Sequence, residues 1–173
     1  MGKGLGLHLQ ILESAGLVVQ ALEVESQSCH RALVDFNAKP TCLIVDLDAF
    51  RTSLIMVEEG NLQFTSSIPI AGNSFTEAIA RSLGVSSQKA EMIKRKVGLS
   101  TTVEYPNIKT ALLPVIGNLV AEVKNIVKFH SEHSQNKVQK IILAGGSAKL
   151  KNLAESLAPE FQAEGLTVEM GKP

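Results

Sequence analysis

Tryptophan is absent from the 173-residue sequence, and aromatic residues make up only 4% of it. A chain with so few aromatic side chains has little on which the bases of single-stranded nucleic acid could stack. The 17 lysine and arginine residues are balanced by 17 aspartate and glutamate residues. The chain therefore also lacks the basic field that attracts nucleic acid, and we expect no nucleic-acid partner.

Cysteine is scarce as well, and its two residues, Cys29 and Cys42, do not have the spacing of metal ligands. No apolar run approaches the roughly 20 residues needed to cross a bilayer, and no apolar signal-peptide core follows Met1. These absences predict a reducing, cytoplasmic setting. The P-loop, nucleophile-elbow and zinc-protease motifs are missing too, so none of these catalytic classes is indicated.

The most informative segment that is present is an apolar run that ends in two glycines. Residues 141–144 are Ile-Ile-Leu-Ala, and Gly145, Gly146 and Ser147 follow, before a helical pattern that starts at Leu150. Glycine lets a backbone approach a ligand closely, and a helix N-terminus offers unpaired N–H groups to polar or anionic ligands. The alternative is a tight turn between strand and helix, which this segment alone favours.

The remaining patterns indicate an α/β fold. Helical periodicity and capping residues predict helices over residues 5–15, 26–36, 75–83, 88–97, 106–133 and 150–157. Runs rich in Val, Ile and Leu predict strands over residues 17–24, 41–47, 52–57, 62–70, 138–144 and 166–170. Ser26 is the expected cap of the second helix, Asn73 or Ser74 that of the third, and Ser86 or Ser87 that of the fourth. The three strands between residues 41 and 70 have tight connections, which predicts an antiparallel meander.

Two pairs of polar residues are candidates for chemistry. Asp46 and Asp48 lie two apart at the end of a strand, so they share a face and could hold a hydrated Mg²⁺; a solvated strand end is an equal alternative. Glu91 and Lys94 lie three apart on a helix and also share a face. They are either an exposed ion pair, which contributes little to stability, or a clamp for the hydroxyls of a sugar and the edge of a purine.

Two histidines end the long helix over residues 106–133. His130 and His133 are three apart, but the sequence offers no further metal ligands beside them. We interpret them as cations that face the helix C-terminal dipole when protonated. Within the same helix, Pro114 should either kink it or mark its true start.

Taken in order, these elements resemble the second lobe of the actin-like ATPase superfamily, which has a ribonuclease-H-like fold. More closely, the chain resembles the PilM proteins of type IV pilus assembly and their cell-division relative FtsA. The segments behind this resemblance are residues 45–54 (VDLDAFRTSL), 70–79 (IAGNSFTEAI), 90–94 (AEMIK) and 141–150 (IILAGGSAKL). Residues 15–19 and 23–32 resemble the family's exit from its first lobe.

The resemblance implies a role for each matched position. Asp46 would be the metal-side aspartate of the second phosphate motif, and Thr52 the hydroxyl that opens the next strand. Glu91 and Lys94 would hold the adenosine of ATP or ADP, bound with Mg²⁺. The remaining nucleotide-binding positions would be Asp48, Gly72, Gly145, Gly146 and Ser147, the last three lining the adenine and ribose.

The chain departs from the family pattern in two ways. Family members commonly have glycine where this sequence has Asp48, and a carboxylate there would repel phosphate oxygens unless a metal intervenes. The family's first phosphate motif and the segment that follows the position of Pro173 are missing. We therefore expect this chain to form only one wall of the cleft, as a fragment or a natural remnant, and leave open whether it hydrolyses ATP.

The resemblance also implies a domain organisation and a function. Residues 1–39 would be the end of a first lobe and the interlobe segment, and residues 40–173 the second lobe, with a helical subdomain inserted at about residues 73–104. The expected function is that of a cytoplasmic pilus-assembly component that uses nucleotide as a clamp between lobes. Its partner would be the cytoplasmic tail of a PilN-like membrane protein, at the inner face of the inner membrane, and self-association is a further expectation. The alternative is an actin-like scaffold that binds no nucleotide.

Overall fold

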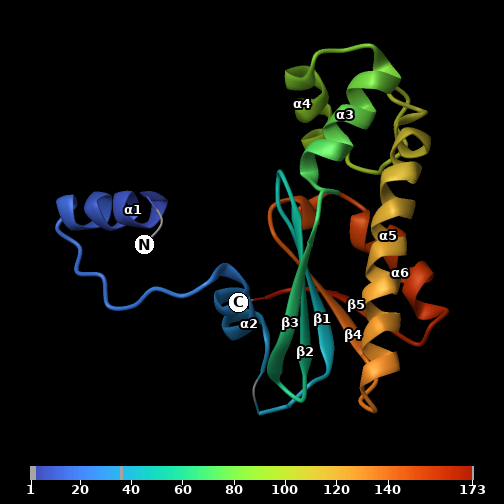
Figure 1. Ribbon diagram of the computed structural model, residues 1–173. Helices are drawn as coiled ribbons and strands as arrows, with labels where there is room; N and C mark the ends of the chain where they lie inside the picture. Colours follow the sequence, from blue (N-terminus) through green and yellow to red (C-terminus); the bar gives the residue numbers. More distant parts are fainter. Residues whose placement is uncertain (1–2, 36, 173) are drawn as a thin grey trace.

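The computed structural model describes residues 3–35 and 37–172 as an α/β body with an N-terminal helix set apart from it (Figure 1). The helices are α1 (Lys3–Ser14), α2 (Glu25–Leu33), α3 (Gly72–Leu83), α4 (Ser87–Val97), α5 (Ile108–His133) and α6 (Leu153–Gln162). The strands are β1 (Cys42–Leu47), β2 (Thr52–Glu58), β3 (Asn61–Ile68), β4 (Lys140–Ala144) and β5 (Thr167–Met170). A short 3₁₀ helix, η1 (Ser147–Lys149), follows β4.

The five strands form one sheet in the order β3-β2-β1-β4-β5. The expected meander is confirmed, because β1, β2 and β3 pair antiparallel in sequence order. Strand β4 then pairs parallel to β1, and β5 parallel to β4. The turn between β2 and β3 uses Glu59 and Gly60, whose φ angles of 49° and 79° suit a tight hairpin turn.

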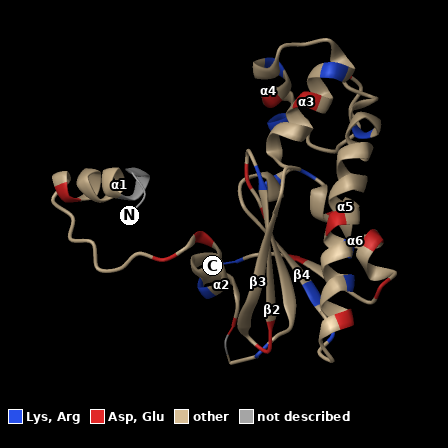
Figure 2. Ribbon diagram, in the orientation of Figure 1, with Lys and Arg blue, Asp and Glu red and all other residues tan. Residues whose placement is uncertain are grey.

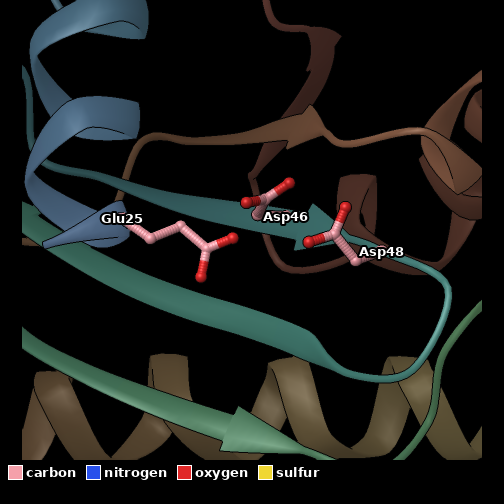
Figure 3. Close-up of side chains that lie close together, drawn as sticks. All are labelled: Glu25, Asp46 and Asp48. Atoms are coloured by element: carbon pink, nitrogen blue, oxygen red, sulfur yellow. The ribbon is translucent and has the colours of Figure 1, made fainter. Parts of the chain in front are cut away.

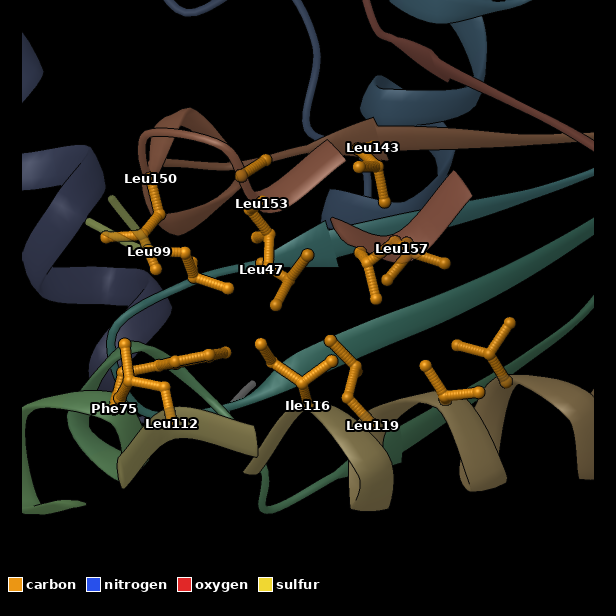
Figure 4. Packing of buried hydrophobic residues seen from close by; sticks show 14 of the residues in the cluster. Leu47, Phe75, Leu99, Leu112, Ile116, Leu119, Leu143, Leu150, Leu153 and Leu157 are labelled. Atoms are coloured by element: carbon orange, nitrogen blue, oxygen red, sulfur yellow. The ribbon is translucent and has the colours of Figure 1, made fainter. Parts of the chain in front are cut away.

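The two faces of the sheet are covered by different helices. One face packs against α5, α6 and the start of α3, where Leu47, Phe75, Leu112, Leu143 and Leu157 meet in the larger core cluster (Figure 4). The other face packs against α2, through a smaller cluster that contains Val34, Cys42, Ile44, Ile55, Val57 and Ile142. Because β1 lies in the centre of the sheet with helices on both sides, every one of its residues is buried.

Helices α3 and α4 pack together at one end of the sheet, next to α5 (Figure 1). Positively and negatively charged residues are interspersed along most of the fold, whereas β3 carries none (Figure 2). The lobe boundaries at residues 39 and 40, and the extent of an inserted helical subdomain at residues 73–104, stay predictions.

Two predictions for the N-terminal region are wrong. Residues 17–24 form no strand but run extended between α1 and α2, with Val18 and Val24 largely exposed. A run of β-branched residues makes a strand only where another strand supplies hydrogen-bond partners, and none does so here. Helix α2 begins at Glu25, so Val24 and not Ser26 is its N-cap. The helix ends at Leu33, and Phe36, its expected last residue, lies outside the described residues.

Other boundaries moved by a few residues. Helix α3 begins at Gly72, ahead of its expected caps, and the Ser74 hydroxyl accepts a hydrogen bond from the Ala71 N–H at 3.2 Å. Helix α4 has its expected cap, since Ser86 Oγ accepts from the Lys89 N–H at 3.3 Å. Pro114 lies inside α5 and does not mark its start.

Helix α5 is the one described helix that is long and apolar enough to cross a membrane, judged by length and composition alone. Its apolar residues are not distributed like those of a lipid-exposed helix, because Leu112, Ile116, Leu119 and Val123 face the core. The core helix of a water-soluble protein passes the same test, so we assign α5 to the core.

The C-terminal end of α5 is tied to β2 by one carboxylate. Glu58 accepts hydrogen bonds from Ser134 Oγ and Asn136 Nδ2, each at 2.7 Å, and its Oε2 lies 3.0 Å from His130 Nε2. His130 is buried, and its Nε2 contacts Glu58 of β2; its expected role as a cation facing the helix dipole stays a prediction. His133 stays at the surface and donates from Nδ1 to the Phe129 carbonyl at 2.7 Å.

The packing of α5 leads to a first prediction, for two adjacent leucines. Leu112 is fully buried, whereas Leu113 is 52% exposed. We expect Leu112→Ala to lower the free energy of unfolding by about 2–5 kcal/mol, because it leaves a cavity under the sheet. Leu113→Ala should change it by no more than about 0.5 kcal/mol. Urea unfolding measures both values, and equal effects would contradict the orientation of α5.

The contacts of Glu58 lead to a second prediction, on pH. Hydrogen bonds from Ser134, Asn136 and His130 lower the pKa of Glu58 to about 2 from its ordinary 4.5. A lowered pKa stabilises the fold above pH 4.5, and this contribution is lost as the pH falls from 4.5 towards 2. Thermal unfolding of Glu58→Gln should therefore show a lower midpoint than the parent at neutral pH, with the gap closing in acid. Glu59→Gln is the matched control, and an equal loss in that variant would contradict the assignment.

Candidate functional site

A cleft of about 540 Å³ lies where β1 and β4 end and helices α3 and α4 approach them. Its lining residues come from α3, α4, η1 and the loops that follow β1 and β4: Asp48, Ala49, Asn73, Phe75, Glu91, Lys94, Arg95, Gly146, Ser147, Lys149 and Leu150. Strands β1 and β4 are parallel, so both present their carboxyl ends here. Ligands of open α/β sheets bind at such carboxyl ends, which makes this cleft the candidate site.

Glu91 and Lys94 meet on one side of the cleft, as their spacing predicts. Lys94 is 7% exposed, and its ammonium donates to Glu91 Oε2 at 2.7 Å. It also donates to the Gly72 carbonyl and to Thr76 Oγ1, each at 2.9 Å, so its three N–H groups all have acceptors. The pair is therefore not the exposed surface pair of the alternative interpretation, but a buried anchor between α3 and α4.

Glu91 is held ionised by its neighbours. Thr76 Oγ1 donates to its Oε2 at 2.6 Å, and Arg95 Nε donates to its Oε1 at 2.8 Å. Burial alone would raise the pKa of Glu91, but the hydrogen bonds from Lys94, Thr76 and Arg95 outweigh it and lower the pKa to about 2. A carboxylate offers about four lone-pair positions, so one position remains on Oε1 of Glu91, which lines the cleft.

The two glycines after β4 differ in their backbone angles and in the space around them. Gly145 has a φ of +84°, and a Cβ there would lie 2.5 Å from the Leu47 carbonyl oxygen, so only glycine fits beside β1. Gly146 has ordinary helical angles, and a Cβ there would meet nothing within 4 Å. The α-helix expected from Leu150 begins only at Leu153, and the 3₁₀ helix η1 follows the glycines instead.

Asp48, which follows β1, joins the start of α3 to η1. Its backbone carbonyl accepts from the Gly72 N–H at 2.8 Å and from Ser147 Oγ at 3.2 Å. A Cβ at Gly72 would meet Ser147 Oγ and lie 3.1 Å from the Asp48 carbonyl oxygen, so a larger residue there would turn the Ser147 hydroxyl away. Thr52, by contrast, does not line the cleft: its fully buried hydroxyl donates to the Ile70 carbonyl at 2.5 Å.

A cluster of three carboxylates adjoins the cleft through Asp48. Glu25, Asp46 and Asp48 each have an oxygen within 4.8 Å of the others (Figure 3). Asp46 comes from the strand face that α2 covers, and Glu25 from the first turn of α2, which is why the two meet. Glu25 also pairs with Arg51. The sequence analysis missed Glu25, since only the docking of α2 on the sheet brings it here.

The cluster is electrostatically unfavourable when no cation is bound. Burial raises the pKa of Asp46, the Cys29 thiol offsets part of this effect, and the charges of Asp48 and Glu25 raise it further. Burial and the neighbouring Asp46 raise the pKa of Cys29 to about 12. Carboxylate oxygens arranged in this way suit a divalent cation, which would relieve their repulsion.

Comparison with known proteins assigns the fold and the family. The family model described as type IV pilus assembly protein PilM matches residues 7–171. The cell division protein FtsA of Escherichia coli K12 is 25% identical over 193 residues, which cover 95% of this chain and 45% of FtsA. FtsA of Pseudomonas aeruginosa is 25% identical over 179 residues, covering 91% of this chain and 42% of that protein. The chain thus spans less than half the length of these curated relatives.

Solved structures agree. A structure described as the PilM-PilN type IV pilus biogenesis complex matches with a TM-score of 0.68 and 25% identity, over 95% of this chain and 49% of that one. The ethanolamine utilization protein EutJ of Carboxydothermus hydrogenoformans matches with a TM-score of 0.71 and 22% identity, over 94% and 54%. MreB5 of Spiroplasma citri, bound to AMPPNP, matches with a TM-score of 0.67 and 17% identity, over 99% and 60%. The last two show the fold alone, which is that of the actin-like proteins.

The two glycines lead to a third prediction. Gly145→Ala should lower the free energy of unfolding by at least about 1–3 kcal/mol, because alanine tolerates neither the positive φ nor the contact with β1. Gly146→Ala should leave stability within about 0.5 kcal/mol of the parent. Chemical denaturation of both variants measures the difference. A tolerated Gly145→Ala would mean that the end of β4 does not lie against β1 as described.

Proposed function

Because this chain belongs to the family of type IV pilus assembly proteins called PilM, we propose that its cleft is one wall of a site for ATP or ADP. The observation that carries the proposal is the continuity of the cleft: Glu91, Lys94, Gly146 and Ser147 lie at one end, and Asp48 joins it to the carboxylate cluster at the other. A site with hydroxyl acceptors at one end and metal ligands at the other suits a nucleotide bound with a divalent cation.

The adenosine end would be recognised by polar contacts and by a close approach of backbone. The remaining acceptor position of Glu91 would take a ribose hydroxyl, while Lys94 keeps the carboxylate ionised and oriented. Gly146, which has open space where a Cβ would lie, would let a purine ring come close to the backbone. Ser147 would orient this loop through its contact with Asp48.

The phosphate end would need Mg²⁺. Asp46, Asp48 and Glu25 form a donor set of hard oxygens, which fits a magnesium ion that keeps some of its waters. Without a cation, the same three charges would repel the phosphates. The proposal therefore assigns Asp46 as the metal-side residue and makes nucleotide affinity depend on magnesium. Hydrolysis is not part of this proposal, because the carboxylate of Asp48 would lie close to the phosphates.

For the longer protein we propose a role in pilus assembly, with nucleotide acting as a clamp between two lobes. Such a clamp works by population shift, so nucleotide must bind the closed state more tightly than the open one. The similar PilM in the solved complex is bound to PilN. By analogy, a PilN-like cytoplasmic tail would be the partner here and would hold the protein at the inner face of the membrane. Self-association is part of the same proposal.

A second candidate, a scaffold that keeps the fold and binds no nucleotide, is favoured by one observation. Three carboxylates lie at the phosphate end, where a phosphate-binding site would offer N–H groups or cations. The Glu91–Lys94 pair argues against the scaffold candidate if the fold retains the pair as a ligand site. The same pair fits the scaffold candidate if it only joins α3 to α4. Replacing Asp48 by glycine separates the two candidates when nucleotide binding is measured without magnesium, because only a nucleotide site gains affinity when the repulsion is removed.

The fourth prediction concerns nucleotide binding. The full chain is titrated with Mg·ADP and Mg·ATP, and amide-resolved NMR monitors the titration. We expect shifts at Glu91, Lys94 and residues 145–149, and weaker binding of ATP when magnesium is removed. Glu91→Gln should weaken binding roughly tenfold, because a hydrogen bond to a charged acceptor is lost. Glu77→Gln, on the exposed side of α3, is the matched control and should bind like the parent.

The result that would overturn the proposal is equally specific. If neither the parent nor Asp48→Gly shows localised shifts at high nucleotide concentration, this lobe does not recognise adenosine and the scaffold candidate holds. If shifts appear only in Asp48→Gly, the site is intact but the carboxylate blocks it in the parent.

A further inference from the structure

The N-terminal arm, which is residues 6–24, carries an apolar surface without a covering partner. None of these residues, all of which the structure describes, is buried. Leu7 and Ile11, four apart on α1, are 58% and 57% exposed, and Val18 in the extended segment over residues 17–24 is 81% exposed. The arm runs from α2 away from the sheet (Figure 1). Apolar surface gathered in this way marks a site of protein–protein contact.

The area that the arm leaves open is large enough for a stable interface. The chain exposes 10370 Å², whereas a compact monomer of 18.5 kDa exposes about 8,200 Å². The excess of about 2,200 Å² is well above the roughly 800 Å² that each partner contributes to a standard protein–protein interface. A partner that covered only part of the arm would therefore already bury enough surface.

The same chain has an open strand edge that fits the arm. Strand β3 forms one edge of the sheet, is 8 residues long and includes no charged residue. Proteins ordinarily protect such an edge with charges or proline, because its free N–H and C=O groups pair readily with another strand. The segment over residues 17–24 is equally long, extended and rich in Val and Leu, and no described strand pairs with it.

An exposed aromatic side chain lies next to this edge. Phe129 of α5 packs edge-on against Phe64 of β3, with ring centroids 5.7 Å apart, and is still 50% exposed. It offers an apolar seat beside β3, and the Leu7 and Ile11 face of α1 is the apolar surface that a strand added from the arm would bring along.

The direction of the arm favours the edge of another molecule over its own. Glu23 pairs with Arg31, and Val24 is the extended N-cap of α2, so the base of the arm is fixed. Residues 17–24 contain no Gly, Pro, Asn or Asp that would reverse the chain. Val24 also lines a pocket with Thr65 and Ser67 of β3. Each arm thus leaves its own body beside the edge that would receive the arm of a second copy.

We propose that two copies of this chain exchange their N-terminal arms about a two-fold axis. Residues 17–24 of each copy add a strand to the outer edge of β3 in the other, and α1 covers Phe129 there. Both unmatched surfaces are covered by one contact, which occurs twice. The inference rests on the self-association in the proposed function and specifies its interface, but it uses no residue of the cleft and needs no nucleotide.

The fifth prediction is the oligomeric state of the full chain without nucleotide. Sedimentation equilibrium should give twice the 18.5 kDa mass of one chain. Val18→Asp should weaken the dimer at least about tenfold, because it places a charge in the added strand and in its apolar contact. Val103→Asp, the same change at an exposed site between α4 and α5, is the matched control and should dimerise like the parent.

Amide hydrogen exchange then locates the interface. The amides of residues 17–24 should exchange slowly in the dimer and rapidly in Val18→Asp, because only strand pairing protects them. If Val18→Asp fails to fold by circular dichroism, Leu22→Asp replaces it and should weaken the dimer by a similar factor, since Leu22 is 54% exposed.

Three outcomes would overturn the inference. A chain that stays monomeric at high concentration would mean that a different occupant covers the arm. A dimer in which residues 17–24 exchange rapidly would mean association through another face, and so would a dimer that Val18→Asp leaves intact. All these measurements are made without nucleotide, so failure of the nucleotide proposal is distinguishable from failure of this one.

Discussion

Parallel pairing between β1 and β4 brings together the two strand ends on which the candidate site depends. Ser147 and Asp48 are 99 residues apart in sequence, yet the hydroxyl of one donates to the carbonyl of the other. The pairing is possible because Gly145 has no side chain to collide with the carbonyl of Leu47. Helices α3 and α4 complete the cleft from the side, and the buried Lys94 holds them to one another through Gly72, Thr76 and Glu91.

The cleft has two ends of different chemistry. At one end Glu91 is ionised and surrounded by donors, so it offers an oriented acceptor. At the other end Asp46, Asp48 and Glu25 are crowded carboxylates, and burial raises the pKa of Asp46. Among the described residues only Glu25 of this cluster forms an ion pair, with Arg51. This crowding is why a divalent cation that arrives with the nucleotide is central to the proposed function.

Asp48 has two separate roles after β1. Its side chain lies within the carboxylate cluster, while its backbone carbonyl supports Gly72 and Ser147. The position thus combines a structural role, which any residue's backbone can fill, with a charge that glycine would not bring. Because the two roles use different atoms, a substitution at this residue can change the electrostatics of the cleft and leave its framework in place.

Local patterns in the sequence determined the α/β class, the meander, the cap of α4 at Ser86 and the shared face of Glu91 and Lys94, because each depends on neighbours along the chain. They also misassigned residues 17–24 as a strand, since a strand needs a partner that no local pattern can supply. Only the tertiary structure decided that Glu25 and Cys29 lie beside Asp46, and that Thr52 turns to Ile70 and away from the cleft. These placements depend on how α2 docks on the sheet and how strands pair, and such long-range contacts leave no spacing in the sequence.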